Sequence, residues 1–214
     1  MTTALGRESY GAKYSKSENQ RTAYFWAGKP STLVPCDQHY LAKQMSESIL
    51  SIGLSDPKSP TNVGLIMRAA GCFGVSSVFY TGKRYDRAAP FNTDTQNASL
   101  SIPLTWVPNL PGDIDDNTRV VCVELVEGAI PLPVYQHPGN ALYIFGPEDG
   151  TIGQKVIDRA DSVVFIPTIG SLNLAAAVNV MLYDRLAKMP GRDCYKALIR
   201  KSRDANNHAK VKYT

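Results

Sequence analysis

The chain has 214 residues, of which 43% are hydrophobic and 20% are charged, as expected of a globular protein with a sizeable core. No apolar run reaches the length of a membrane-spanning helix, and the first residues lack the charged-then-apolar pattern of a signal peptide. The four cysteines are widely spaced and form no C-x-x-C pair, which argues against a zinc ribbon or a disulfide framework. We therefore expect a cytoplasmic protein with reduced thiols and no membrane partner.

The formal net charge of +4 is unevenly distributed. Residues 1–29 carry five basic and two acidic side chains, and residues 192–214 carry seven and two. Residues 30–191 carry 11 basic and 15 acidic side chains, so the body is mildly acidic. Basic ends favour a phosphate-rich partner such as nucleic acid, although flexible, solvated termini produce the same pattern.

Three regions follow from this distribution and from the hydrophobic pattern. We predict a basic N-terminal extension over residues 1–37, a folded domain over residues 38–190 and a basic C-terminal tail over residues 191–214. The extension contains an aromatic cluster, "YFWAG", beside basic residues. Such a cluster either anchors a tail to its own domain, which we prefer, or stacks on unpaired bases.

From residue 38 onward, short apolar segments alternate with segments of helical pattern. In chain order we expect a short helix within 39–50, a strand at 49–54, a helix at 61–74, a strand at 75–82, a loop or short helix at 93–99, strands at 119–126 and 141–146, a helix at 151–160, a strand at 162–167 and a helix at 172–188. This alternation predicts an α/β fold with a mostly parallel sheet flanked by helices.

Ligands of open α/β sheets bind beyond the carboxyl ends of the strands. In this chain those ends combine glycine and proline with unpaired polar residues. They are "LSDPKSPTN" at 54–62, "ELVEGA" at 124–129, "FGPEDG" at 145–150 and "IPTIGSLN" at 166–173. We expect the functional site there.

Several common site motifs are absent. No G-x-G-x-x-G follows a strand, and neither G-x-x-x-x-G-K-[ST] nor G-x-S-x-G occurs, so a dinucleotide fingerprint, a phosphate loop and a nucleophile elbow are not indicated. The three histidines, His39, His137 and His208, have no spacing that suggests a catalytic triad or a metal site. His137, in "YQHPGN", is predicted to lie in a turn.

The segment "PTNVGLIMRAAG" holds the first polar motif. Gly64 and Arg68 are four residues apart and share one helix face, so bare backbone lies next to the guanidinium and a bulky ligand could approach. Asn62 lies at the expected start of the helix. Taken singly, these residues also fit an ordinary N-cap and a surface arginine.

Two further motifs follow later strands. Glu148 comes after a buried strand, where a solvated turn residue would also fit. Ser171 and Asn173 interrupt the apolar start of the last helix. Helix capping by a side-chain oxygen explains one of these two residues, but not obviously both.

Together, N-x-G-x-x-x-R-x-A (62–70), F-G-P-E (145–148) and I-P…S-L-N-L (166–174) resemble, in order and spacing, the three signature motifs of the SpoU/TrmH branch of the SPOUT RNA methyltransferases. The resemblance covers roughly residues 48–190. It implies a parallel sheet with a deep C-terminal trefoil knot and a homodimer, for which exposed apolar positions on the last helix (Val180, Leu182 or Tyr183) would be suitable. It also implies methyl transfer from S-adenosylmethionine to a ribose 2′-hydroxyl of tRNA or rRNA, without a metal ion.

The same resemblance implies the residues of the site. Arginine is effectively always protonated in proteins, so we expect Arg68 to stabilise a developing alkoxide or to orient ribose and phosphate rather than to act as a base. Asn62 and Glu148 would set its position. The implied catalytic residues are Asn62, Arg68, Glu148, Ser171 and Asn173, and the implied cofactor-binding residues are Glu124, Leu125, Gly146, Ile166, Ser171 and Leu174.

The chain departs from the family pattern at three positions that bear on the choice of target. The turn "TIG" at 168–170 is short, Ala175 stands where a second serine is common, and glycine follows Glu148 after two residues instead of three. Two alternatives remain open at this point. One is a catalytically silent, knotted RNA-binding or assembly protein, and the other is an enzyme that methylates a base nitrogen.

Overall fold

The computed structural model describes residues 48–88, 102–112, 114–189, 199 and 203–211. All of these belong to one compact unit, Pro35–Thr214. The N-terminal extension, most of the helix expected within 39–50 and the segment 93–99 lie outside the described residues, as does much of the C-terminal tail. The three-region organisation therefore stays a prediction.

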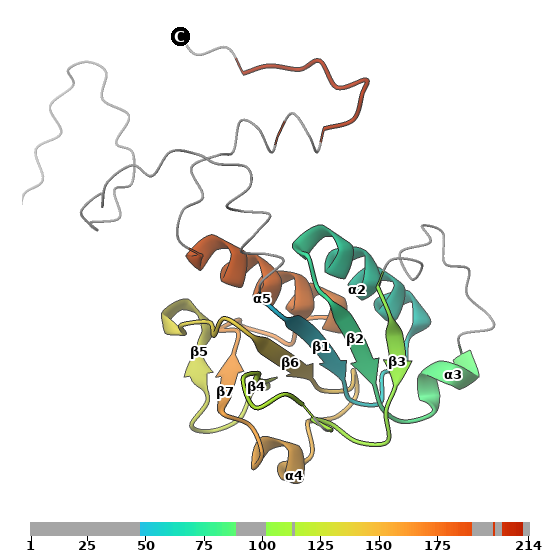
Figure 1. The fold of residues 1–214 in the computed structure, drawn as a ribbon, viewed down its shortest axis with the longest axis vertical. Helices are drawn as coiled ribbons and strands as arrows, with labels where there is room; N and C mark the ends of the chain where they lie inside the picture. Colours follow the sequence, from blue (N-terminus) through green and yellow to red (C-terminus); the bar gives the residue numbers. More distant parts are fainter. Residues whose placement is uncertain (1–47, 89–101, 113, 190–198, 200–202, 212–214) are drawn as a thin grey trace, which may run out of the picture. The chain divides into compact units, whose positions relative to one another are not determined.

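The described part of the chain forms a seven-stranded sheet in the order β3-β2-β1-β6-β4-β7-β5, and every neighbouring pair is parallel (Figure 1). The expected α/β class with a parallel sheet is confirmed. The short strands β3 and β5 were not predicted, because two or three residues are too few to show a periodic pattern. The strands are β1 Leu50–Leu54, β2 Ser77–Tyr80, β3 Leu104–Trp106, β4 Arg119–Val123, β5 Ile130–Pro131, β6 Ala141–Phe145 and β7 Ser162–Phe165.

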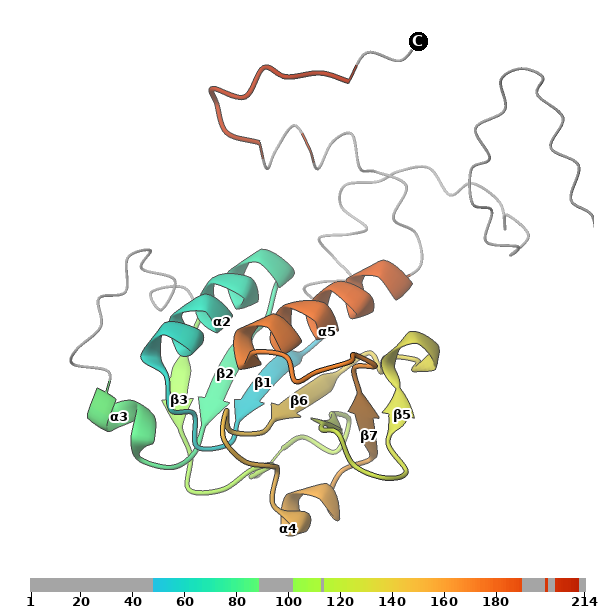
Figure 2. The same cartoon turned by 180° about the vertical axis from the view of Figure 1, so that it is seen from behind.

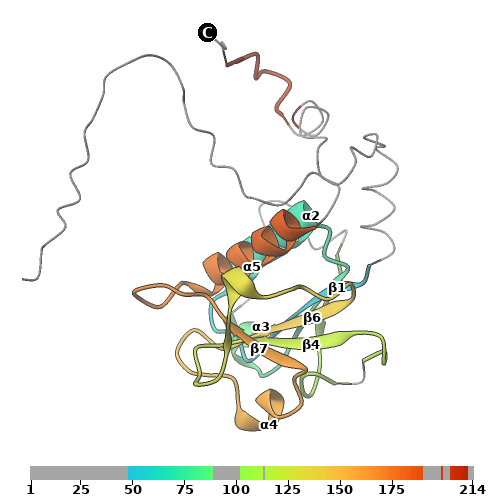
Figure 3. The same ribbon diagram turned by 90° about the vertical axis from the view of Figure 1, so that its left-hand side faces the viewer.

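Helices cover both faces of the sheet. The long helices α2 and α5 pack side by side on one face (Figure 2), and the short helix α4 lies on the other (Figure 3). None of the described helices is long and apolar enough to cross a membrane. The deep trefoil knot stays a prediction. The helices are α2 Pro60–Phe73, α3 Arg84–Ala88, α4 Gln154–Ile157 and α5 Leu174–Lys188, with a 3-10 turn, η3, at Leu132–Val134.

Helix α2 has clear start and stop signals in the sequence. The Ser59 side chain accepts a hydrogen bond from the backbone N–H of Asn62, and Pro60 occupies the first turn, where a missing N–H costs nothing. Gly74 ends the helix in the left-handed conformation, with φ of 69°, and its N–H bonds to the carbonyl of Ala70. By contrast, α4 is only four residues long and has no side-chain cap, so it is shorter than the helix predicted at 151–160.

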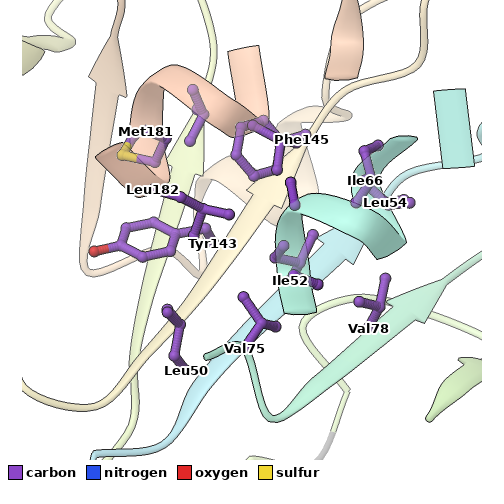
Figure 4. Close-up of a cluster of buried hydrophobic side chains, with 14 of the residues drawn as sticks. Leu50, Ile52, Leu54, Ile66, Val75, Val78, Tyr143, Phe145, Met181 and Leu182 are labelled. Atoms are coloured by element: carbon purple, nitrogen blue, oxygen red, sulfur yellow. The ribbon is translucent and has the colours of Figure 1, made fainter. Parts of the chain in front are cut away.

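Alternate residues of the central strands point to opposite faces of the sheet, as the period of two requires. The larger core lies beneath α2 and α5, where Ile52 and Leu54 of β1 meet Tyr143 and Phe145 of β6 and Met181 of α5 (Figure 4). A smaller core on the other face contains Leu110, Val120, Cys122, Leu142, Ile144 and Ile152. Complete burial of each aliphatic or aromatic side chain contributes about 1.5–3 kcal/mol, which makes this sheet a rigid platform for the loops at its edge.

One expectation about α5 is wrong. Val180, Leu182 and Tyr183 were expected as exposed apolar positions, but the side chain of Leu182 is only 2% exposed. Leu182 shares the face of Val178, which packs on the sheet, whereas Val180 and Tyr183 lie on the outer face.

A buried polar cluster holds the end of α5 against the chain that leads into β6. His137, predicted to lie in a turn, has a buried side chain that is bonded at both ring nitrogens, with Nδ1 2.7 Å from the Tyr143 hydroxyl and Nε2 2.8 Å from Asp184 Oδ2. The Tyr143 oxygen also accepts a hydrogen bond from Arg185 Nη1, so the Tyr143 hydroxyl can donate its own hydrogen bond to His137 Nδ1. The ring is therefore satisfied when it is neutral, with its proton on Nε2.

Backbone carbonyls complete this cluster. Arg185 donates to the carbonyls of Pro138 and Gly139, and Lys188 donates to those of Leu132 and Tyr135. Lys188 also pairs with Asp184 at 2.7 Å. The bonds fix the direction in which α5 leaves the sheet, and hence the position of its other end at the loop edge.

We predict that acidification destabilises the protein through His137. Burial is the main cause that lowers the pKa of His137 below its ordinary value of 6.5, against the raising effect of the Asp184 carboxylate. Below about pH 6.5, His137 therefore binds a proton in the unfolded chain but not in the native state. The free energy of unfolding falls as the pH is lowered. Urea unfolding at pH 7.5 and 5.5 should show a larger loss for the native sequence than for His137→Gln.

The exposed His208 provides the matched control. His208→Gln should keep the full pH dependence of the native sequence. An identical loss of stability between the two pH values in the native protein and in His137→Gln would contradict the assignment.

Candidate active site

The polar loops singled out in the sequence meet at one edge of the sheet. Because β1, β4, β6 and β7 are parallel neighbours, their carboxyl ends lie at the same edge. The loops that follow β4, β6 and β7 carry Glu124, Glu148 and Ser171, and the first turn of α2, after β1, carries Asn62. The expected position of the site is therefore where the fold brings these side chains together.

Two hydrogen bonds join the three motifs. Asn62 Nδ2 donates to Glu148 Oε1 at 3.0 Å, and Asn173 Nδ2 donates to Asn62 Oδ1 at 3.1 Å. These residues are 86 and 111 positions apart in the sequence. We refer to Glu148, Asn62 and Asn173 as the polar triad.

Glu148 is the acceptor at one end of the polar triad. Its carboxylate also accepts the backbone N–H of Lys58 at 2.8 Å and that of Ser59 at 3.0 Å. Partial burial would raise the pKa of Glu148, but the three donated bonds outweigh it and leave the pKa below its ordinary value. Glu148 is thus a fixed anion that ties the loop after β6 to the start of α2.

Asn62 occupies the middle of the polar triad and is only 9% exposed. It lies in the first turn of α2, whereas the cap is Ser59, so the alternative of Asn62 as an N-cap is wrong. A carboxylate only accepts hydrogen bonds, so Asn62 must turn its NH₂ group toward Glu148 and its oxygen toward Asn173. The network therefore fixes the orientation of this amide.

Asn173 and Ser171 have different roles at the start of α5. Asn173 is the N-cap, and its Oδ1 accepts the backbone N–H groups of Ala175 at 2.9 Å and Ala176 at 3.3 Å. The side-chain oxygen of Asn173 therefore serves as the helix cap, while its NH₂ group donates to Asn62. Ser171 is exposed, and its hydroxyl has no hydrogen-bond partner among the described residues, which leaves it free for a ligand.

Arg68 is not in contact with the polar triad. Its side chain is exposed and has no hydrogen bond or ion pair within the described ranges. Asn62 and Glu148 therefore do not hold it in this structure. Gly64, one turn earlier, lies against open space, since a Cβ built there would have no heavy atom within 4 Å. The outer face of α2 near Arg68 is accessible, as the sequence pattern predicted.

A pocket of about 210 Å³ opens beside the polar triad. Its walls come from the loops after β4, β6 and β7 and from the first turn of α5, and Glu148 forms part of its rim. All six residues expected to bind a cofactor line it: Glu124, Leu125, Gly146, Ile166, Ser171 and Leu174.

Gly146 is required at its position by a close approach of Glu124. A Cβ on Gly146 would lie 2.8 Å from Glu124 Oε2 and 3.3 Å from the backbone nitrogen of Ile152. That carboxylate accepts the N–H of Leu125 at 3.0 Å and of Ile152 at 2.8 Å. Glu124 thus shapes the pocket by joining two of its loops.

Sequence reasoning missed Arg84, which begins α3. Its Nη1 is 2.8 Å from Asp149 Oδ1, and longer ion pairs of 3.9 and 3.7 Å reach Glu148 and Asp56. Asp56 itself has a positive φ of 43°, and it lies so close to Gly82 that a Cβ there would come within 1.9 Å of its Oδ1. Arg84 therefore links the loops after β1, β2 and β6. Nothing in the charged run "GKRYDRA" distinguishes it from a solvated helix.

Within the residues that the structure describes, no group of three or more His, Cys, Asp or Glu side chains could hold a metal ion. The polar triad supplies a fixed anion and two oriented amides next to the pocket, and Ser171 adds a free hydroxyl. Such a site can bind and orient a polar ligand.

Comparisons with known proteins agree with this geometry. The sequence profile of the SpoU rRNA Methylase family matches residues 49–183, which hold the sheet, the polar triad and the pocket. The chain belongs to this family. The resemblance noted in the sequence is therefore confirmed at the level of the family.

Two curated relatives and one solved structure illustrate the match. The chain is 26% identical over 153 residues to the 23S rRNA (guanosine-2′-O-)-methyltransferase RlmB of Acinetobacter baylyi, covering 66% of this chain and 60% of the relative. It is 28% identical over 151 residues to the 23S rRNA (uridine(2479)-2′-O)-methyltransferase of Streptomyces viridochromogenes, covering 64% and 52%. The chain thus spans only between half and two thirds of the length of these relatives.

The solved structure is that of the SpoU methyltransferase AviRb from Streptomyces viridochromogenes in complex with the cofactor AdoMet. It superimposes with a TM-score of 0.54 at 23% identity, covering 66% of this chain and 58% of the other. This likeness establishes the fold of the SpoU domain.

We predict that Glu148→Gln destabilises the protein although it conserves the shape of the side chain. Both carboxylate oxygens accept a backbone N–H, so in either orientation the new NH₂ group would face a donor. These bonds are partly exposed to water, so their loss should cost about 0.5–1.5 kcal/mol and appear as a lower urea midpoint at pH 7. The matched control is Glu127→Gln on an exposed turn, which should change nothing. Equal midpoints for the two variants would contradict the role of Glu148.

Proposed function

We propose that this chain transfers a methyl group from S-adenosylmethionine to a ribose 2′-hydroxyl of RNA. The observation that carries the proposal is the polar triad, which joins all three family motifs at the rim of the pocket. Curated relatives in the same family are named as rRNA ribose 2′-O-methyltransferases, and a structural neighbour was solved with AdoMet.

The residues of the pocket fit the cofactor. Backbone N–H and C=O groups around Gly146, Ile166 and Ser171 suit the edge of an adenine ring, and Leu125 and Leu174 offer apolar surface. When bound, S-adenosylmethionine supplies an electrophilic methyl group on a sulfonium. The close approach at Gly146 means that this loop has no room for a side chain beside the ligand.

The residues of this chain would contribute positioning and charge. Placing the 2′-hydroxyl in line with the methyl group supplies a large part of the rate enhancement, and the oriented amides of the polar triad and the free Ser171 hydroxyl are suited to this task. Arg68 lies six residues, or about 9 Å, along α2 from Asn62. Its exposed guanidinium has no partner among the described residues, and with RNA bound it would hold a phosphate or a developing alkoxide.

The decisive experiment is methyl transfer from labelled S-adenosylmethionine to total RNA from cells that lack the gene, followed by mass spectrometry of the nucleosides. A 2′-O-methylated nucleoside would establish the reaction and name the base. We expect Arg68→Ala to reduce transfer by at least about 100-fold, the range seen when a single electrostatic contact to the transition state is removed.

The exposed Arg159, after α4, provides a matched arginine control, and Arg159→Ala should leave transfer unchanged. Arg68→Lys keeps the charge but loses the planar pair of donors, so it should also be impaired. Full activity in Arg68→Lys would contradict the bidentate role. Binding of S-adenosylhomocysteine without transfer to either tRNA or rRNA would favour the catalytically silent RNA-binding protein. A methylated base nitrogen would favour the alternative enzyme that methylates a base nitrogen.

We further propose that two copies of the chain associate through the outer faces of α2 and α5. Leu65 on α2 and Val180 and Tyr183 on α5 are exposed apolar side chains on neighbouring helices. Large apolar groups that share one face of a small domain are typical of an interface. A second copy is the occupant that the family resemblance implies.

We also infer a cytoplasmic site of action, where RNA is available and the thiols stay reduced.

Charge on this face should dissociate the dimer. We expect Val180→Glu combined with Tyr183→Glu to convert a dimer to a monomer in sedimentation velocity, because an unpaired buried carboxylate is strongly unfavourable. The control is Val134→Glu, which places a charge at another exposed apolar position, in η3. A monomeric native protein, or a double variant that remains dimeric, would contradict this interface.

A further inference from the structure

Trp106 is an exposed tryptophan at the functional edge of the sheet. It is the last residue of β3 and pairs with Tyr80 of β2, so it lies at the carboxyl end of the parallel sheet. The residue is 47% exposed. Its ring has no aromatic or cationic partner among the described residues. A large apolar ring thus faces solvent at the edge where the ligand loops gather.

The ring is held in place by its own N–H group. Trp106 Nε1 donates to the carbonyl oxygen of Gly82 at 2.9 Å. Gly82 lies against Asp56, and Asp56 binds back to the loop after β2 through its N–H and the Thr81 hydroxyl at 3.1 Å. The edge of the indole is therefore anchored to a tightly packed turn, which reduces the entropy lost when a ligand stacks on its face.

Two cations beside this turn have no carboxylate partner. Lys83 follows Gly82 directly, and Arg87 lies one turn later, with its backbone N–H bonded to the Lys83 carbonyl. Both side chains are exposed, and neither forms an ion pair or side-chain hydrogen bond within the described residues. The nearby carboxylate of Asp86 is already occupied by the Tyr80 hydroxyl at 2.6 Å.

The remaining carboxylates of this corner lie around Arg84. Its guanidinium pairs with Asp149 and lies 3.7 Å from Asp56 and 3.9 Å from Glu148. Lys58 adds a second, longer contact to Asp149 at 3.4 Å. The same arginine therefore connects the turn that anchors Trp106 with Glu148 of the polar triad. A ligand stacked on Trp106 would therefore be connected to the proposed reaction site through Arg84.

We propose that Trp106, Lys83 and Arg87 form a subsite for an unpaired nucleotide of the RNA substrate, next to the nucleotide that is methylated. The base stacks on the exposed indole face, and the two cations contact the flanking phosphates. An aromatic face with adjacent unpaired cations is the combination that binds single-stranded nucleic acid. This subsite rests on the proposed function, since it assumes that RNA reaches this edge of the sheet.

Trp106 can be observed directly, because the chain has only one other tryptophan, Trp26. In full-length Trp26→Phe protein, acrylamide quenching of the fluorescence reports the exposure of Trp106 alone. We expect rapid quenching in the free protein and protection when a single-stranded oligouridine or bulk tRNA is added. Heparin, which is a polyanion without bases, should not protect the ring. Protection by heparin, or a ring already shielded without RNA, would overturn the proposal.

Affinity measurements in the otherwise native chain test the same subsite. Trp106→Ala should weaken binding of the RNA about 5- to 150-fold, which corresponds to the loss of about 1–3 kcal/mol of stacking. Trp106→Phe keeps an aromatic face and should retain most of the affinity. Lys83→Ala and Arg87→Ala should each reduce the slope of log K against log salt concentration by about 0.7. Native affinity in Trp106→Ala would overturn the proposal.

A cofactor measurement separates this subsite from the proposed function. None of the three residues lines the pocket, so every variant should bind S-adenosylhomocysteine like the native chain. Normal cofactor binding and methyl transfer without RNA protection of Trp106 would refute only the subsite. RNA protection of Trp106 without methyl transfer to any RNA would refute the enzyme and support the subsite.

Discussion

The arrangement of the site depends on one buried amide. Asn62 has a single orientation that satisfies both neighbours, because the Glu148 carboxylate can only accept and the Asn173 oxygen already caps α5. Reversing the amide of Asn62 or that of Asn173 would place two donors or two acceptors against each other, at a cost of about 1–3 kcal/mol for each unpaired group. The start of α2, the loop after β6 and the start of α5 therefore hold one another in register.

Two functional surfaces follow from this register. On one side of Glu148, the loops after β4, β6 and β7 form the pocket, where the contact of Glu124 with Gly146 determines the wall. On the other side, Arg84 joins Glu148 to the turn that anchors Trp106. A ligand in the pocket and a polymer lying across α3 would thus meet at the polar triad. The exposed Arg68 lies on the outer face of α2, where Gly64 leaves the approach open.

Much of the fold could be predicted from the sequence, because strands β1, β4, β6 and β7 are buried apolar runs and α2 has clear capping signals. The meeting of the polar segments also followed, since parallel strands bring their carboxyl ends to one edge. The bonds between Glu148, Asn62 and Asn173 could not be predicted, because they join residues far apart in the chain. The buried contacts of His137 could not be predicted for a similar reason. A histidine before Pro138 suggests a turn, but its partner Asp184 lies on the distant helix α5, as does Arg185, which binds the Pro138 carbonyl.

The most direct test of this account is a crystal structure of the chain with S-adenosylhomocysteine. The account predicts the ligand in the pocket lined by Glu124, Gly146, Ile166 and Ser171, with both hydrogen bonds of the polar triad intact. A ligand bound elsewhere on the chain, or a bound complex in which Asn62 has left Glu148 and Asn173, would contradict it.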